Sequence, residues 1–452
     1  MASESPLRSQ ASRRAVFQAC GVVWEYGRSA ITGISTRLSG PGAVALAGLS
    51  ASAIGLVASP VQARALGPED RGAVAAVAAA TIIVPILLSF GAPLELRNRA
   101  ASEDPAPLVR AARLASFASL VPAAAVTLIL WLTFFSGLSH STKLAAAMAV
   151  AASPVAIAVT MRTSVLMARE RFGAVFAIRL VAPVSMLAGL LILLVRDAAS
   201  AFSVILLIPG SQAIALVVAL ACFRVGIRGP RSAIWPIYRA SSGFAGARVG
   251  EIALAQLPAM IALPWASSAD AGIYSVAATI LAMPIAIGTA LGAAHHPRIA
   301  RDVATQGLNA RYADAVRQAI ALGLIVTILL LAIVPWAVPL VFGPEFASAV
   351  GPAALLSVAA MPLTANTALT AFLGARRQGR AMTVSYLAGV AVLASAWLLP
   401  VDFRNALTLA GAVAASQLVV CVVMLVAHGD WRGIAPRRQD YRESLVALAG
   451  RQ

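Results

Sequence analysis

The feature that most constrains this chain is a series of twelve apolar runs, each about as long as a helix that crosses a lipid bilayer. Such a helix needs about 20 apolar residues and satisfies its backbone amides within its own segment. The runs are too long for the roughly ten-residue strands of a membrane β-barrel. We therefore predict an all-α polytopic membrane protein with about 12 transmembrane helices, near residues 43–63, 72–94, 114–135, 144–168, 172–195, 200–223, 243–264, 271–294, 318–342, 346–373, 381–399 and 405–427.

The composition agrees with this fold class. Of the 452 residues, 60% are hydrophobic and only 12% are charged, against about a quarter charged in ordinary globular domains. Basic residues near the ends of spans stay on the cytoplasmic side of a membrane. Of the 35 Lys and Arg residues, all but five lie at the termini or in alternate connections, and the exceptions are Arg64, Arg71, Lys143, Arg196 and Arg404. This pattern predicts an even number of spans with both termini in the cytoplasm.

The net charge of +17 could indicate a nucleic-acid partner, but the cytoplasmic placement of the basic residues already explains it. The Arg residues are scattered over short connections, with no basic domain and no interleaved aromatic platform, so we expect anionic membrane lipids and no nucleic acid. The three Cys and four His residues show no metal-ligand or redox spacing, and no nucleotide-binding loop or nucleophile elbow is present. We expect no cofactor, no bound metal and no enzymatic activity.

One turn occurs twice, two hundred residues apart. The stretch ARALGPEDRGAVAAV begins at Ala63, and LPWASSADAGIYSVA begins at Leu263, so that Asp70 and Gly72 match Asp270 and Gly272. Both stretches follow the first span of a six-span block. Turns in general favour Gly, Asp and Pro, but the equal offsets favour an internal repeat.

An internal repeat of six spans predicts how the lobes are arranged. Because six is even, both blocks enter from the same side and are related by a pseudo-twofold axis along the membrane normal. We predict six-helix lobes at 43–224 and 242–427, a cytoplasmic linker at 225–241, and cytoplasmic tails at 1–42 and 428–452. Two lobes around a cleft are typical of an alternating-access transporter. Interior prolines would kink the spans that flank the cleft, at Pro85, Pro93, Pro258, Pro264 and Pro284.

Glycines four residues apart occur in the seventh and eighth spans. Small residues at this spacing let membrane helices approach closely. We therefore predict that these two spans pack against each other through Gly243, Gly246 and Gly250 on one and Gly288 and Gly292 on the other.

Several stretches resemble one known family. QARALGPEDRGAVAAV is similar to the LARxLGPxxxG pattern of bacterial polysaccharide flippases in the multidrug, oligosaccharidyl-lipid and polysaccharide exporter superfamily. VLMARERFGAVFAIRLV, PLVFGPEFASAVGPAALLSVAA and LTAFLGARRQGRAMTVSYL resemble the same family in the same order, over about residues 43–427. The resemblance implies a flippase of the bacterial cytoplasmic membrane. Its substrate would be a polyprenyl-diphosphate-linked glycan moved to the outer leaflet, and its partners other polysaccharide-assembly proteins.

Charged residues inside or beside the spans are the candidate substrate contacts. A charge at the bilayer centre costs about 2.5–3.5 kcal/mol, so such residues usually face protein or water. Three cations, Arg162, Arg179 and Arg248, lie toward the cytoplasmic ends of spans, and Arg97 adds a fourth in the first inner connection. Arg can grip a diphosphate with two parallel hydrogen bonds. The alternatives are snorkelling to headgroups and, for Arg248, neutralisation by Glu251 three residues later.

Rival functions stay open at this point. A cation-coupled multidrug exporter needs acidic groups in its cleft, yet Glu251 is the only carboxylate well inside any span. A peptidoglycan-precursor flippase is closer, although the members of that branch typically carry fourteen spans. A glycan polymerase would need a large outer loop with acid and base groups, and the outer connections are short. An inert membrane scaffold would leave the repeat and the prolines unexplained.

Overall fold

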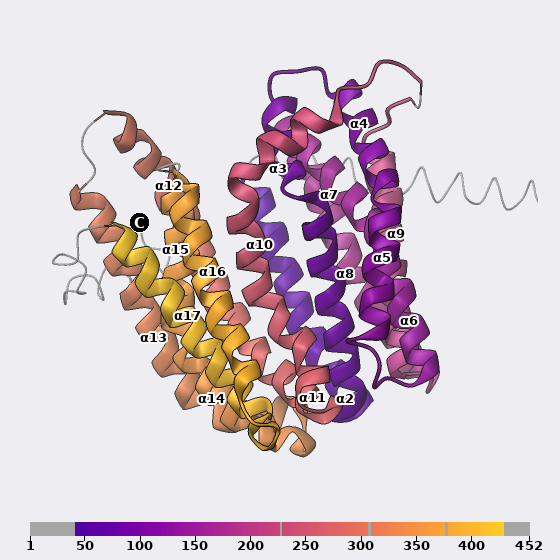
Figure 1. Ribbon diagram of the computed structural model, residues 1–452, viewed down its shortest axis with the longest axis vertical. Coiled ribbons are helices and arrows are strands. Elements are labelled where there is room, and N and C mark those ends of the chain that lie inside the picture. Colours follow the sequence, from indigo (N-terminus) through magenta and orange to yellow (C-terminus); the bar gives the residue numbers. More distant parts are fainter. Residues whose placement is uncertain (1–40, 227, 306–308, 376–377, 429–452) are drawn as a thin grey trace, which may run out of the picture.

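The computed structural model describes residues 41–226, 228–305, 309–375 and 378–428, which form helices and connecting turns without a strand (Figure 1). The helices of the first half are α2 (Pro41–Ser89), α3 (Ala92–Ala100), α4 (Pro105–Ala118), α5 (Leu120–Leu132), α6 (His140–Ala151), α7 (Ser153–Ala168), α8 (Phe172–Val195) and α9 (Ala201–Cys222). Those of the second half are α10 (Ile234–Trp265), α11 (Ser268–Ala278), η1 (Thr279–Leu281), α12 (Ala282–Thr305), α13 (Asn309–Phe342), η2 (Pro344–Ala349), α14 (Val350–Val358), α15 (Ala360–Ala375), α16 (Gly379–Ser395), η3 (Ala396–Leu398), η4 (Val401–Phe403) and α17 (Ala406–His428).

The helices account for all twelve predicted runs. Within the described residues, ten helical segments are long and apolar enough to cross a membrane, and α14 with α15 forms an eleventh span bent by 46°. The twelfth lies inside α2, because this 49-residue element would be about 70 Å long if straight, more than twice the thickness of the hydrocarbon. The prediction of an all-α polytopic membrane protein is confirmed.

Residue Gly67 divides α2 into two arms that run in opposite directions. Its backbone is left-handed, with φ 70° and ψ 177°, a conformation that glycine adopts without strain. The Arg71 Nη2 donates to Ser59 Oγ at 3.0 Å, although twelve helical residues would separate these positions by about 18 Å. The chain must therefore reverse between them, and the two arms are the first and second predicted spans.

Prolines explain where the other spans break. A proline ring inside a helix collides with the carbonyl four residues earlier, and three breaks follow this rule. Pro122 faces the carbonyl of Ala118, the last residue of α4; Pro154 faces that of Val150 near the end of α6; Pro362 faces that of Val358, the last residue of α14. The hydroxyl of Ser153 donates a hydrogen bond to the carbonyl oxygen of Val150. Each bent span thus remains one membrane crossing.

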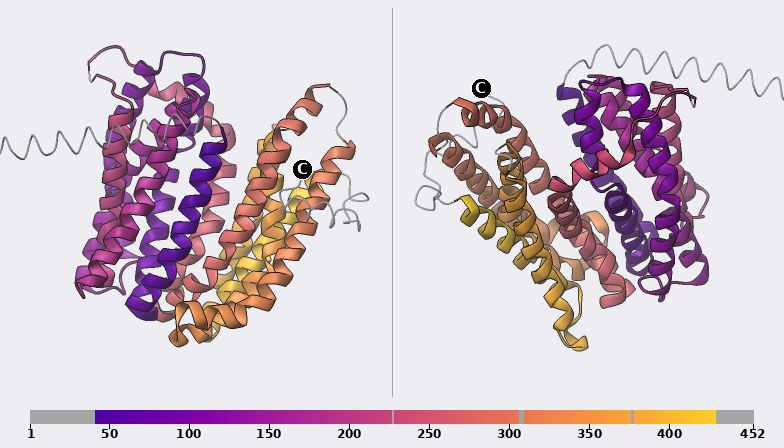
Figure 2. Two further views of the ribbon diagram at one scale, coloured as in Figure 1. Left: turned by 180° about the vertical axis from the view of Figure 1, so that it is seen from behind. Right: turned by 45° about the horizontal axis from the view of Figure 1, so that its top comes forward.

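The helices form two lobes. One apolar core joins the second arm of α2 with α6, α8 and α9, and a second core joins α11, α13, α15, α16 and α17. Helix α10 packs against α2 on one side and α16 on the other. The lobes meet near α11 and the turn of α2, and they diverge toward the ends of α3, α4 and α12 (Figures 1 and 2). We call these two ends of the molecule the closed end and the Arg-rich end.

The predicted glycine contact between the seventh and eighth spans is wrong for Gly246, Gly250, Gly288 and Gly292, while the surroundings of Gly243 lie outside the described residues. A Cβ on Gly246 or Gly250 of α10 would meet Thr383 or Tyr386 of α16, and a Cβ on Gly288 or Gly292 of α12 would meet α15. The glycines do permit close approach, but each set serves a neighbour within its own lobe. Spacing alone could not identify the partner helix.

Candidate functional site

A cavity of about 890 Å³ lies between the two lobes. Its walls come from α2, α7, α8 and α9 on one side and from α11, α12, α15, α16 and α17 on the other, with α10 between them. The volume is near the top of the range of about 300–1,000 Å³ found for small-molecule pockets. Most of the lining is apolar or weakly polar. The charged side chains on the wall are Arg71, Arg248 and Glu251.

The repeated turns close one end of this cavity by packing directly against each other. A Cβ on Gly72 would lie 2.0 Å from the carbonyl oxygen of Ser268, and a Cβ on Gly272 would lie 1.8 Å from that of Pro68. Neither position can hold a side chain while the turns are in contact. Both matched positions are therefore glycine for the same reason, because each provides space for the backbone of the opposite lobe.

The two matched aspartates have equivalent partners. The Asp70 Oδ2 accepts a hydrogen bond from Ala201 N at 3.3 Å, and the Asp270 Oδ1 accepts one from Ala406 N at 3.1 Å. Ala201 begins α9 and Ala406 begins α17, which are the sixth spans of the two lobes. A carboxylate at a helix N-terminus satisfies a free amide and complements the helix dipole. Each aspartate thus ties the second span of its lobe to the sixth.

A second contact crosses the closed end beside the repeated turns. Arg64, on the first arm of α2, donates from Nη2 to the carbonyl oxygen of Leu340 on α13 at 2.6 Å. A Cβ on Gly67 would lie 3.9 Å from the carboxylate of Glu345. The closed end is therefore held by several contacts between the lobes and not by the repeated turns alone.

The most unusual charge in the cavity is Arg71, at the closed end. Its side chain is buried and donates to Gln62 Oε1 and to Ser59 Oγ. Its Nε has no hydrogen-bond partner, and none of the ion pairs in the described residues includes it. A buried cation costs several kcal/mol unless it is paired. Arg71 is thus a desolvated cation on the cavity wall with capacity left for an anion.

Further toward the Arg-rich end, the wall carries Arg248 and Glu251 of α10. The Arg248 Nη1 lies 2.7 Å from the Glu251 Oε2, and the two side chains are 55% and 34% exposed. This confirms that they form a pair three residues apart on one helix face, and an exposed pair of this kind contributes little to stability. Arg248 lies about 25 Å from the end of α10 at Trp265, and Arg71 lies about 5 Å from its own turn, so the two levels are roughly 20 Å apart at 1.5 Å per residue. The two cations therefore lie near opposite ends of the cavity.

The opposite wall is polar without being charged. The Asn366 Nδ2 donates to the side-chain and backbone oxygens of Gln417 at 3.0 and 2.9 Å, while the buried Asn366 Oδ1 has no partner. The hydroxyls of Thr370 and Tyr386 lie 2.7 Å apart. Amide and hydroxyl groups at a cavity wall can hydrogen-bond to sugar hydroxyls or to ordered water.

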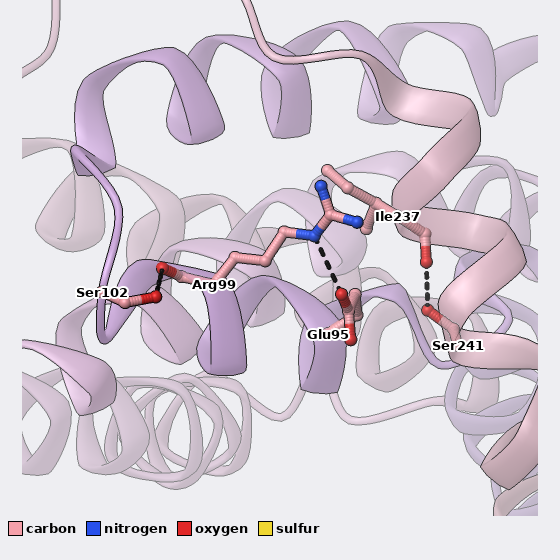
Figure 3. A network of polar contacts seen from close by, with 5 residues as sticks. All are labelled: Glu95, Arg99, Ser102, Ile237 and Ser241. Atoms are coloured by element: carbon pink, nitrogen blue, oxygen red, sulfur yellow. Dashed lines mark hydrogen bonds and ion pairs between the residues drawn. The ribbon is translucent and has the colours of Figure 1, made fainter.

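The structure does not bring Arg97, Arg179 or Arg162 to this cavity wall. Arg97 on α3 and Arg179 on α8 are exposed and lie within electrostatic range of each other. Figure 3 shows the region around α3: Arg99, two residues after Arg97, pairs with Glu95 at 2.8 Å and extends toward Ile237 of α10. Arg162 lines a separate groove on the far side of α7.

Sequence reasoning missed Arg71 as a site residue and counted it only among the basic residues of the outer connections. One signal was available. The repeat matches Asp70 with Asp270 and Gly72 with Gly272, but places Arg71 opposite Ala271. A charge present in only one copy of a repeated turn marks a difference between the lobes.

The sequence profile of the family described as "Polysaccharide biosynthesis protein" matches residues 38–302, more than half of the chain. The chain belongs to the polysaccharide biosynthesis protein family. A search of curated proteins finds no match. As a member of this family the chain is a multi-pass membrane transporter of the flippase type, which agrees with the cavity between its lobes.

Solved structures similar to this family member are transporters of the same fold. The lipid II flippase MurJ, in an inward closed conformation, aligns with a TM-score of 0.68 at 9% identity over 90% of each chain. An inward-facing multidrug resistance MATE transporter of the MOP superfamily aligns with a TM-score of 0.61 at 15% identity, over 90% of this chain and 99% of its own. A MOP superfamily transporter from Pyrococcus furiosus aligns with a TM-score of 0.57 at 14% identity, over 93% and 96%. At these identities the likeness shows the shared fold.

Proposed function

We propose that the protein is an alternating-access flippase for a polyprenyl-diphosphate-linked oligosaccharide or polysaccharide repeat unit. It would move this lipid-linked glycan from the cytoplasmic to the outer leaflet of the bacterial cytoplasmic membrane during synthesis of cell-surface polysaccharide. Other proteins of polysaccharide assembly would supply and consume the cargo. The observation that carries the proposal is Arg71, a buried cation on the cavity wall whose Nε has no hydrogen-bond partner.

The charge balance of the cavity favours an anionic cargo. Two Arg side chains and one Glu side chain line it, which leaves a net positive wall when all three are ionised. In a site shielded from water the attraction for a phosphate is much stronger than in bulk solvent. Arg also matches the geometry of phosphate oxygens with parallel N–H donors.

The two cations suggest a route through the cavity. With both termini in the cytoplasm, the Arg-rich end faces inward and the lobes diverge toward the cytoplasm. Arg97 and Arg179 would raise the local concentration of the anion near the cavity mouth. Arg248 would exchange Glu251 for the diphosphate, and Arg71 would hold the cargo before the closed end opens. We place Arg162 outside this route.

A peptidoglycan-precursor flippase is the second candidate, favoured by the likeness to the lipid II flippase MurJ. Its cargo also carries a lipid diphosphate, so Arg71 supports both candidates. A multidrug exporter is less well supported, because a positive wall repels organic cations and Glu251 is the only carboxylate that lines the cavity in the described residues.

The test is flipping in liposomes that contain the purified full-length protein. The probes are a polyprenyl-diphosphate oligosaccharide, a lipid II analogue, the same oligosaccharide on a neutral polyprenol, and a cationic rhodamine dye. We expect transport of the first probe at more than about ten times the rate of the neutral one, the factor for roughly 1.4 kcal/mol of charge recognition. Arg71→Gln should remove this preference, whereas Arg196→Gln, which alters an exposed Arg outside the cavity, should not.

Each alternative has its own result in the same assay. Faster transport of the lipid II analogue would favour the peptidoglycan-precursor flippase. Transport of the dye, with none of either diphosphate, would contradict the proposal and favour the multidrug exporter. Equal rates for the charged and neutral oligosaccharide lipids would show that the diphosphate is not recognised.

A further inference from the structure

A second hollow of about 370 Å³ lies on the flank of the N-terminal lobe, lined by α4, α5, α7 and α9. Helix α7 separates it from the central cavity. Ser153 and Ala156 of α7 line the central cavity, while Pro154, Ala158 and Arg162 line the flank groove. At 100° per residue these two sets lie on opposite faces of the helix. The flank groove is therefore a separate site that the proposed route does not use.

The volume and the mostly apolar lining of the groove suit part of a hydrocarbon chain. Helix α7 packs against both α4 and α9 and makes the floor between them. Apolar side chains that remain well exposed stand at the rim, with Phe117 63%, Leu120 50% and Leu220 40% exposed. In a membrane-spanning lobe these exposed apolar groups face lipid. An acyl chain lying in the groove would fill space that the surrounding helices leave open.

Two cations stand together in this otherwise apolar groove. Arg113 of α4 and Arg162 of α7 both line it, and each lies close enough to feel the charge of the other. Arg162 is only 5% exposed. Among the described residues, no ion pair contains either one. Two like charges held together without a counter-ion attract an anion strongly.

Backbone carbonyls use only part of the donor capacity of these two arginines. The Arg162 Nη1 donates to the Phe223 oxygen at 3.2 Å, and the Arg113 Nη2 donates to the Val225 oxygen at 3.0 Å. These carbonyls follow the end of α9 and begin the connection to α10, and both guanidinium groups keep further N–H donors. Arg110 binds the same connection through Gly226 and Pro230, at 3.1 and 3.0 Å, but it does not line the groove.

We propose that this flank groove binds an anionic phospholipid of the surrounding membrane. One acyl chain would lie along the groove past Ala158, and the phosphate would bind Arg113 and Arg162 beside the connection between the lobes. The apolar lining and the paired cations at one site match a ligand with a hydrocarbon tail and a negative head. A phospholipid fits better than the cargo because α7 separates the groove from the transport cavity. The site does not depend on the proposed function.

The test is native mass spectrometry of the purified full-length protein with added phosphatidylglycerol or phosphatidylcholine of the same acyl composition. Arg113→Gln should weaken phosphatidylglycerol binding about fivefold, the factor for one Arg near an anionic lipid, without changing phosphatidylcholine binding. Ala158→Phe should fill the groove and weaken binding of both lipids. Arg110→Gln and Thr160→Phe are the matched controls, since the first loosens the same connection and the second adds the same bulk to an exposed position of α7.

Four results would overturn the proposal. Unchanged phosphatidylglycerol binding in both Arg113→Gln and Ala158→Phe would remove the site. An equal loss in Arg110→Gln would show that the connection, and not the phosphate contact, controls binding. Competition by glycerol phosphate as strong as that by phosphatidylglycerol would indicate a phosphate site without a chain. Displacement of phosphatidylglycerol by an equal amount of polyprenyl phosphate would assign the groove to the carrier lipid.

Discussion

The two repeated turns, at residues 63–77 and 263–277, both close the cavity, but different residues reverse the chain in each. In the first, Gly67 makes the reversal with a left-handed backbone. In the second, Ser267 begins α11 with an extended backbone and its Oγ accepts from Asp270 N at 3.0 Å. Beyond this difference each turn has an aspartate that caps a sixth span and a glycine that accepts the opposite backbone.

The residue between the aspartate and the glycine separates the two copies. It is Arg71 in the first turn and Ala271 in the second. Arg71 is buried and lines the cavity, whereas Ala271 packs in the core of the second lobe. Under the proposed function, closure requires both copies of the turn, while recognition of the cargo needs a charge in only one. The predictions below test this division.

The largest effect is expected when either matched glycine is replaced. Gly72→Leu and Gly272→Leu place a side chain where the opposite backbone lies at 2.0 and 1.8 Å, and packed backbone cannot shift by that much without opening the contact. Each variant should abolish flipping and expose Ser275→Cys, introduced in the same chain at a buried position of the cavity wall, to a membrane-impermeant maleimide added from outside. Gly55→Leu is the control, because a Cβ there meets nothing within 4 Å. Normal flipping by either variant would show that the turns need not touch.

Replacing the charge in the first turn should have the next largest effect. Arg71→Ala should lower the flipping rate about 10- to 100-fold, the factor for the 1.5–3 kcal/mol of one charged hydrogen bond. Arg71→Lys should keep part of the activity as a point charge without the paired donors. Ala271→Arg should not restore Arg71→Ala, because position 271 faces the core of its lobe. Full activity of Arg71→Ala at equal protein density would contradict the role of this cation.

At the other end of the cavity, Arg248 should matter less because it is 55% exposed and already paired. Arg248→Lys should retain most of the activity. Arg248→Ala should lower the activity several-fold, and Arg248→Glu should lower it further. The assay is restoration of surface polysaccharide in a strain that lacks the gene, with membrane abundance measured for each variant. Full restoration by Arg248→Glu at normal abundance would remove Arg248 from the route.

The smallest effects are expected at the two matched aspartates. Asp70→Ala and Asp270→Ala each remove one helix cap, which costs about 1 kcal/mol and should lower the melting temperature in detergent by about 1–2 °C. Since the two carboxylates cap different helices, their effects should add. A large shift for one variant and none for the other would show that the turns are not equivalent.

Much of the fold could be predicted from the sequence because the membrane imposes strong rules. Length and charge located the spans, including the two arms of α2, and the offsets of Asp70 and Asp270 revealed the repeat. Which helix each glycine contacts could not be predicted, since Gly246 could face any neighbouring helix and in fact approaches α16. For the site, the pairing of Arg248 with Glu251 followed from helix geometry. The burial of Arg71 and the separate groove at Arg162 depend on how distant helices pack, which periodicity does not encode.

The central claim is that the closed end must open for cargo to pass. Arg64 and Leu340 lie on opposite lobes and are joined by the Arg64 side chain. In a chain whose three native cysteines are replaced by Ala, Arg64→Cys and Leu340→Cys can be linked by a bis-methanethiosulfonate reagent about as long as an Arg side chain, which forms a disulfide with each thiol and releases methanesulfinate. The flipping rate of the polyprenyl-diphosphate oligosaccharide in liposomes is then measured before linking, after linking, and after reduction. We predict that complete linking stops flipping and that reduction restores it; an unchanged rate in the fully linked protein would contradict the account.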